Sequence, residues 1–232
     1  MKTPTFSLFA FLLVLIAGCS KSPDSNDNTP IIVCTWDTVF YDDFQRTDTL
    51  LGSNYQAIIQ PTPHGGHGFA DIWNNSLRIS SDSVFWAIVY NPSVDGSRTR
   101  VSVQCVTPAS GGTCAFAVGG KFTNPGTTTQ TGYLAAAMNN GIGIYKIVNG
   151  FMTPLASQAY QVQYNHTYKL SLTMNYSSLS AVITDEASGV SVTVTTTDGE
   201  TGLSGKYYTL NGNSLGGQVV LLFDNFLLER CQ

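Results

Sequence analysis

The chain ends on residues 219–232, which read VVLLFDNFLLERCQ. The run is apolar and rich in residues that favour β-strands, and Cys231 is its second-to-last residue. Chain ends usually fray unless other contacts tie them down, so an apolar terminal run predicts a strand held inside the fold. A disulfide from Cys231 would hold it there, and the remaining cysteines therefore decide which segment lies beside it.

Five cysteines occupy positions 19, 34, 105, 114 and 231. Without Cys19, which lies in the N-terminal targeting segment, an even number remains, as expected for disulfides in an oxidising compartment. Cys105 and Cys114 flank VTPASGGT, a turn-like segment between two strand-like runs, which predicts a hairpin whose arms a disulfide ties. Of three possible pairings, this one leaves Cys34 with Cys231. A cysteine-based metal site is the alternative, but close pairs such as C-x2-C are absent.

The first thirty residues predict targeting and a tether rather than a fold. Lys2 precedes an apolar run at residues 6–17, and the ending LIAGC resembles the lipobox of bacterial lipoproteins. The resemblance implies a signal peptide at residues 1–18 and a lipid on Cys19. Residues 19–30 are polar and predict a flexible tether.

The lipobox followed by CSKS resembles Bacteroidetes lipoproteins. This resemblance implies a lipid anchor in the bacterial outer membrane, with the protein either periplasmic or exposed at the cell surface. Ordinary secretion with Cys19 uninvolved is the alternative.

The composition is that of a weakly charged, secreted β protein. Charged residues make up 11% of the chain, against about 25% in an average soluble domain. The net charge is −4 and no cluster of Lys and Arg is present, which excludes a nucleic-acid partner that needs phosphate neutralisation.

Alternation with a period of two runs through the rest of the chain. In TYKLSLTM, residues 167–174, the apolar Tyr168, Leu170, Leu172 and Met174 share one face. Asn-Asn-Gly at residues 139–141 separates two further strand-like runs, which is a strong hairpin signal. About eleven to thirteen strands are predicted, which favours an all-β, antiparallel sandwich or barrel.

Several segments resemble the concanavalin A-like lectin/glucanase superfamily, in particular laminin-G-like jelly rolls. They are FYDDFQRTDTLLGSNY at 40–55, IWNNSLRI at 72–79, GYLAAAMNNGIGIYKIVNG at 132–150 and the D-N-F strand of the terminal run. The resemblance implies one antiparallel, two-sheet jelly-roll sandwich over residues 31–232, with the first and last strands side by side. That arrangement agrees with the Cys34–Cys231 pairing.

The catalytic signatures of the superfamily's enzymes are missing from the sequence. Laminarinase-like enzymes carry E-x-D-x-x-E on one strand, whereas the only glutamates here are Glu186, Glu200 and Glu229, far from such a string. The alginate-lyase strings are also absent, and His166 in YNHTYKL fits a surface histidine at a strand entry. We therefore expect a non-catalytic protein, with a divergent polysaccharide-degrading enzyme as an alternative.

Four residues are candidates for ligand contact. His64 and His67 lie in the glycine-rich loop PHGGHGFAD, where backbone can approach a ligand closely. Trp73 adjoins the turn residue Asn74, and tryptophan rings stack on sugar faces.

Two acidic residues are candidates for a structural calcium site. Asp43 lies near the first strand and Asp224 near the last, where related jelly rolls hold calcium. The overall expectation is a membrane-anchored module that binds extracellular or cell-surface glycan. A structural or adhesive module that contacts protein is the alternative.

Overall fold

The terminal run forms β15 (Val219–Cys231), which lies inside a sheet rather than at its edge. The structure is a computed structural model, and it describes residues 34–46, 50–60, 68–81, 84–90, 98–109, 113–199, 203–215 and 219–232. Residues 34–232 form one compact unit. Within the described ranges, no helix has the length and apolar character that a membrane span requires.

Eight antiparallel strands form the first sheet, called sheet A. Its order is β13, β12, β11, β6, β15, β4, β3, and β1 also pairs with β15. Their bounds are β1 Trp36–Asp42, β3 Gly68–Trp73, β4 Ser76–Ser81, β6 Arg98–Val106, β11 Thr167–Asn175, β12 Ser178–Asp185 and β13 Ser191–Thr197. On one side β15 pairs with β6, and on the other it pairs first with β4 and then with β1.

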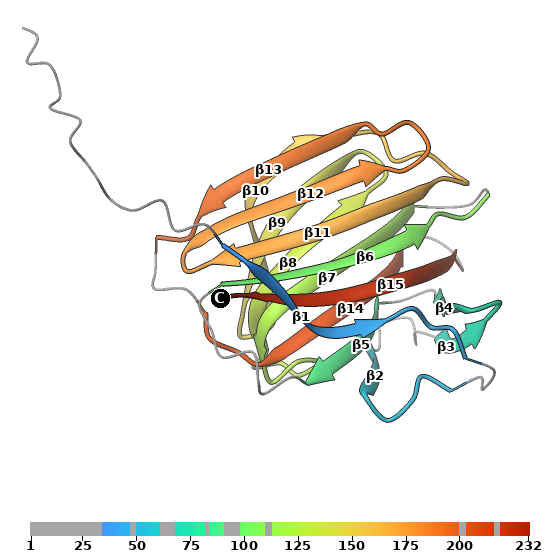
Figure 1. Ribbon diagram of the computed structural model, residues 1–232, viewed down its shortest axis with the longest axis horizontal. Helices are drawn as coiled ribbons and strands as arrows, with labels where there is room; N and C mark the ends of the chain where they lie inside the picture. Colours follow the sequence, from blue (N-terminus) through green and yellow to red (C-terminus); the bar gives the residue numbers. More distant parts are fainter. Residues whose placement is uncertain are drawn as a thin grey trace, which may run out of the picture. The chain divides into compact units, whose positions relative to one another are not determined.

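Seven antiparallel strands form sheet B, which stacks against sheet A as a second layer (Figure 1). Its order is β10, β9, β8, β7, β14, β5, β2. Their bounds are β2 Tyr55–Gln60, β5 Val84–Tyr90, β7 Thr113–Thr123, β8 Thr131–Met138, β9 Gly141–Val148, β10 Phe151–Ala159 and β14 Tyr207–Leu215. The predicted fold class, an all-β two-sheet sandwich, is confirmed.

Side chains from the two inner faces fill the space between the sheets. The apolar set predicted for residues 167–174 is confirmed, because Tyr168, Leu170, Leu172 and Met174 are all fully buried in β11. Sheet B contributes alternate residues in the same way, such as Ala135 and Ala137 of β8.

The Cys34–Cys231 disulfide is present, with the two Cα atoms 5.4 Å apart. It joins the residues just before β1 to the end of β15, and Trp36 is in register with Cys231. Figure 1 shows β1 running alongside the terminal strand, near the C-terminus. The first and last strands are therefore neighbours, as expected.

The hairpin expected around Cys105 and Cys114 is wrong. Cys105 lies in β6 of sheet A, whereas Cys114 lies in β7 of sheet B, so the two strands do not pair. Both strands are apolar enough to lie in a buried sheet, so consecutive strands can belong to different layers of the sandwich. Cys105 is fully buried, and the side chain of Cys114 lies outside the described part of the structure. The pairing of these two cysteines stays a prediction, and it would link the two sheets.

The described residues contain fifteen strands, more than the eleven to thirteen expected. One strand without a clear pattern in the sequence is β10, at the edge of sheet B. It contains Pro154 and is exposed along most of its length, so it shows no apolar alternation. Proline is tolerated at a sheet edge because its missing N–H leaves no inner partner unpaired.

Candidate functional site

Charge is distributed very unevenly between the two sheets. In the strands of sheet B the only charged residues are Lys121 and Lys146. Lys121 is buried, and burial lowers the pKa of its ammonium group. The Nζ of Lys146 lies 2.8 Å from Oδ2 of Asp198, a carboxylate that also accepts a hydrogen bond from the Tyr133 hydroxyl. Both lysines are thus withdrawn from solvent, which leaves the outer face of sheet B without an exposed charged side chain among the described residues.

Small side chains form a line across this outer face. Ser157, Gly143, Ala136, Ala117 and Asn211 are successive register partners on β10, β9, β8, β7 and β14. We call these five residues the outer-face row. With strands about 4.8 Å apart, the row is about 19 Å long. The next register partner of Asn211 is Trp86 of β5.

The alternation of the strands places the row outside the sandwich. Ala117 and Ala136 belong to a small apolar cluster with Leu134, which is separate from the core between the sheets. Their chain neighbours Val118 and Ala135 are in that core. Sheet B therefore has a second, smaller apolar cluster on the side that faces away from sheet A, and the residues of this cluster are nearly buried.

Tyr145 lies across this surface because its neighbour two residues earlier is glycine. A Cβ atom on Gly143 would come within 2.9 Å of the Tyr145 ring and of its hydroxyl oxygen. The ring therefore rests on the backbone of its own strand, an approach that only glycine permits. Desolvation raises the pKa of the Tyr145 hydroxyl, which keeps it a neutral hydrogen-bond donor. The ring offers an apolar surface with a polar tip.

A pocket of about 320 Å³ opens beside Tyr145 at the β10 edge of the sheet. Its lining includes the thioether of Met138 and the polar side chains of Asn140, Ser157 and Gln158. No charged residue lines it. A pocket of this size with one aromatic wall and several neutral polar groups is suited to a small neutral ligand. We call it the Tyr145 pocket.

At the other end of the row, Asn211 carries a hydrogen-bond donor that is not used. Asn211 is only 4% exposed, and its Oδ1 accepts a hydrogen bond from Thr209 Oγ1 at 3.0 Å. Its Nδ2 has no hydrogen-bond partner. Because Tyr208 and Leu210 are buried in the core, the alternation of β14 directs Asn211 to the outer face. A buried donor without a partner is costly.

The residues predicted for ligand contact lie elsewhere. Trp73 is 45% exposed at the end of β3, an edge strand of sheet A, and its ring faces the Arg78 guanidinium at 5.3 Å. Asn74 has a φ of 49° and forms the β3–β4 turn, as its Asn-Asn sequence suggested. The structure does not bring Trp73 or Asn74 to the Tyr145 pocket, which lies on the other sheet at the β10 edge. His64 and His67 lie outside the described residues.

Asp43 and Asp224 are close enough for their charges to interact, as the calcium prediction requires. Desolvation raises the pKa of Asp224, and the negative charges of Asp43 and Asp42 raise it further. Each carboxylate accepts a local backbone hydrogen bond, Asp43 from Gln45 and Asp224 from Asn225. Calcium takes six or more oxygen ligands, and no group of three suitable side chains occurs among the described residues. Calcium binding stays a prediction.

Two of the three glutamates form hydrogen bonds or an ion pair with residues of sheet A. Glu186 accepts hydrogen bonds from Gln104 Nε2 at 2.7 and 2.9 Å. Glu229 forms a bidentate salt bridge with Arg100, with nitrogen–oxygen distances of 2.6 and 2.8 Å. Glu200 lies outside the described part of the chain.

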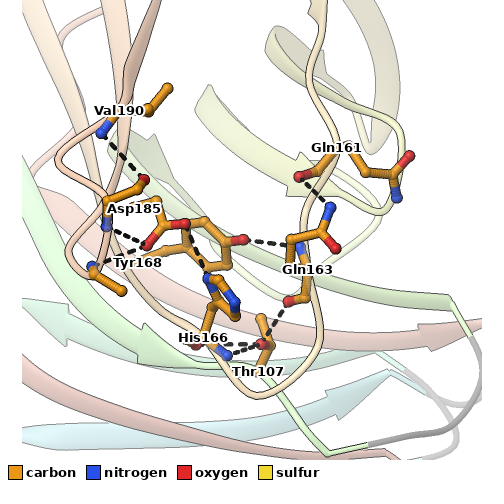
Figure 2. Close-up of polar contacts among 9 residues, drawn as sticks. Thr107, Gln161, Gln163, His166, Tyr168, Asp185 and Val190 are labelled. Atoms are coloured by element: carbon orange, nitrogen blue, oxygen red, sulfur yellow. Dashed lines mark hydrogen bonds and ion pairs between the residues drawn. The ribbon is translucent and has the colours of Figure 1, made fainter.

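His166 belongs to a polar cluster that holds the segment before β11 in place by hydrogen bonds (Figure 2). Its Nδ1 lies 2.9 Å from Oδ2 of Asp185, and its ring stacks on Tyr168. Its backbone N–H donates to Thr107 Oγ1, and that hydroxyl donates to the carbonyl of Gln163. The cluster joins the segment before β11 to the β12–β13 turn. None of its residues lines the Tyr145 pocket. The reading of His166 as a strand-entry residue agrees with this position.

Comparison with known proteins identifies the fold but no family. No protein-family profile and no curated protein sequence matches the chain. Among solved structures, carbohydrate-binding module CBM66 from Bacillus subtilis aligns with a TM-score of 0.58 at 15% identity, covering 76% of this chain and 96% of the other. The CBM2 module of the evolved Dit protein of Lactobacillus casei BL23 phage J-1 aligns with a TM-score of 0.59 at 10% identity. This alignment covers 85% of this chain and 97% of the other.

A protein of unknown function with a galectin-like fold, also from Bacillus subtilis, aligns at a TM-score of 0.58 and 12% identity, covering 86% of this chain and 99% of the other. The fold is a lectin-like jelly roll. At these identities the likeness concerns the fold alone, and the site must be argued from its own residues.

Proposed function

We propose that the protein is a non-catalytic module that binds neutral polysaccharide along the outer-face row of sheet B. The unpartnered Nδ2 of Asn211 is the observation that carries this proposal, because a buried donor without a partner is costly and a ligand acceptor would satisfy it once the side chain turns outward. Tyr145 stands at the other end of the row and supplies a ring on which a sugar face can stack.

The chemistry of the face supports a neutral sugar chain as the ligand. Sugar hydroxyls both donate and accept hydrogen bonds, so they can satisfy Asn211, Ser157 and Gln158 together. The two carbohydrate-binding modules that share the fold add support by analogy.

The sequence supports display of this module on a membrane. We infer that Cys19 is lipidated and that residues 19–30 tether the domain to the outer membrane, in line with the lipobox at the end of the signal peptide. Mass spectrometry of the mature N-terminus would detect the lipid on Cys19.

Affinity electrophoresis of residues 31–232 tests the glycan proposal. The gels would contain starch, mixed-linkage β-glucan, xylan, galactomannan or levan, each with added calcium and with chelator. We expect at least one neutral polymer to retard the protein. Loss of retardation in chelator would place calcium in the interaction, and unchanged mobility in every gel would contradict the proposal.

A protein-contact module is the second candidate, and sheet A provides the observation in its favour. Phe69 and Trp73 are each 45% exposed and lie on either side of Arg78, which forms a two-point ion pair with Asp71. Exposed aromatic residues around a fixed arginine are typical of protein interfaces. Failure of every polysaccharide, together with loss of partner binding in Trp73→Ala, would favour this candidate.

A further inference from the structure

We propose a second binding site, for one or two neutral sugar units, at the opposite end of β9 from the Tyr145 pocket. A pocket of about 540 Å³ lies between the β7–β8 loop at residues 124–130 and the β9–β10 turn. Gly141, at the start of β9, lines the Tyr145 pocket, whereas the turn after Val148 lines this one. We call it the Phe151 pocket.

Gln130 holds the walls of the Phe151 pocket in place. It is nearly buried, and its side-chain Oε1 accepts a hydrogen bond from the Gly126 N–H at 2.8 Å. Its backbone carbonyl accepts a hydrogen bond from the Gly150 N–H at 3.0 Å, and its own N–H donates to the Thr127 carbonyl at 3.2 Å. One residue therefore joins the loop to the turn, so the pocket is formed before any ligand arrives.

The turn itself is adapted to this contact. Asn149 and Gly150 both have positive φ, at 50° and 77°. A Cβ atom on Gly150 would lie 3.0 Å from the carbonyl oxygen of Thr128, in a conformation that side chains other than glycine rarely adopt. The close approach of turn and loop thus depends on glycine at this position.

The lining of the pocket combines one exposed ring with neutral polar groups. Phe151 is 79% exposed, the most exposed large apolar residue in the described part of the chain. Thr127, Thr128 and Asn149 are exposed beside it and present hydroxyl and amide groups. A ring with such neighbours can stack on a sugar face and hydrogen-bond its hydroxyls.

The ligand class follows from charge and size. No charged residue lines the pocket, so a uronic acid, sulfate or phosphate would find no counter-charge there. The volume suits a small molecule rather than a polymer segment that must lie across several strands. A chain-end sugar or a short oligosaccharide fits both limits.

Met152 provides a matched control for Phe151. It is the next residue on the same edge strand and is 56% exposed, but it is not part of the pocket lining. Truncation of either side chain to alanine removes an exposed apolar group, so both variants should fold. Only Phe151→Ala removes the ring from the pocket.

The test is an NMR titration of residues 31–232 with the methyl glycosides of glucose, galactose, mannose, xylose and N-acetylglucosamine. We expect at least one glycoside to shift the amide signals of Gly126, Gln130 and Gly150. Phe151→Ala should weaken that binding about ten-fold, as expected for loss of one stacking contact, while Met152→Ala changes it less than about two-fold.

Two results would overturn the second site: no shift at these amides with any glycoside, or equal binding by wild type and Phe151→Ala. A Tyr145→Ala variant separates this site from the outer-face row. It should keep the glycoside shifts even though it loses retardation by polysaccharide, so either site can fail without the other.

Discussion

At the scale of single residues, the candidate site depends on two local arrangements. Gly143 lets the Tyr145 ring lie on the sheet, and Asn211 keeps a donor without a partner at the far end of the same row. An unused buried donor lowers stability, and in the proposed site this donor would gain a ligand acceptor. Stability and ligand binding should therefore respond in opposite directions when this group is removed.

The double variant Thr209→Val/Asn211→Leu tests that statement. It replaces both members of the Thr209–Asn211 hydrogen bond with apolar side chains of similar shape. We expect the free energy of unfolding to stay within about 1 kcal/mol of wild type or to rise, because the orphan donor is gone. Binding to the retained polysaccharide should weaken about ten-fold, the loss of one good hydrogen bond. Chemical denaturation and affinity electrophoresis measure the two effects, and unchanged binding would remove Asn211 from the site.

Two aspartates should give stability–pH profiles of opposite sign. Desolvation tends to raise the pKa of Asp185, but hydrogen bonds from His166 and from the N–H groups of Ala187 and Ser188 outweigh it and lower that pKa. Its contribution to stability is present above the unfolded pKa of about 3.9 and is lost as pH falls through the folded pKa. Asp185→Asn should therefore be less stable than wild type at neutral pH, and the difference should shrink in acid.

Asp224 should behave in the opposite way, because desolvation and the nearby Asp43 and Asp42 raise its pKa. The group's favourable contribution is present below the unfolded pKa of about 3.9 and is lost as pH rises through the folded pKa. Asp224→Asn should thus be more stable than wild type at neutral pH in chelator, with no difference in acid. Denaturation at a series of pH values measures both variants. Stabilisation of wild type, but not of Asp224→Asn, by added calcium would support the calcium prediction.

At the scale of elements, β1 depends on the disulfide more than any other described strand does. It pairs only with β15, and the Cys34–Cys231 bridge closes a loop of 197 residues in sequence separation. The double variant Cys34→Ser/Cys231→Ser should lose about 2–5 kcal/mol of unfolding free energy. Amide hydrogen exchange should rise in β1 before it rises in β11. Equal stability and equal protection of β1 would show that the strand pairing alone holds it.

Strands were predictable from the sequence wherever one face is buried and the other is exposed to solvent. TYKLSLTM shows this alternation, and β11 has the predicted core face. The edge strand β10 has no buried face to produce a pattern, and Pro154 interrupts it. The prediction that β6 and β7 form one hairpin was wrong because a short link can either turn back or lead to the other sheet, and local sequence does not distinguish the two.

The candidate site was not predictable for a related reason. Its row joins Gly143, Ala136, Ala117 and Asn211, which become neighbours only through the register of four strands. Large aromatic residues and histidines are the sugar-contact residues that a sequence makes visible, and they point to Trp73, whereas the floor of the candidate site consists of small side chains. The glycines at 141 and 143 before Tyr145 were the one local signal, since glycine in a strand marks close approach.

At the scale of the whole molecule, the two sheets differ in charge. Arg78, Arg100 and Lys169 lie on strands of sheet A, together with Asp71, Asp224 and Glu229, whereas sheet B keeps its two lysines buried. A ligand on sheet B therefore gains nothing from carrying charge. Polygalacturonate and alginate should not retard the protein at moderate salt, while a neutral polymer should, with little salt dependence. Retardation by acidic polymers alone would move the site to sheet A.

The most direct test of the central claim compares two aromatic variants on opposite sheets. Tyr145→Ala removes the ring from the outer face of sheet B, and Trp73→Ala removes an exposed ring from the edge of sheet A. Affinity electrophoresis of both, in a gel that contains the neutral polysaccharide that retards wild type, should show retardation lost in Tyr145→Ala and kept in Trp73→Ala. Retardation lost in Trp73→Ala and kept in Tyr145→Ala would contradict the account and place the glycan on sheet A.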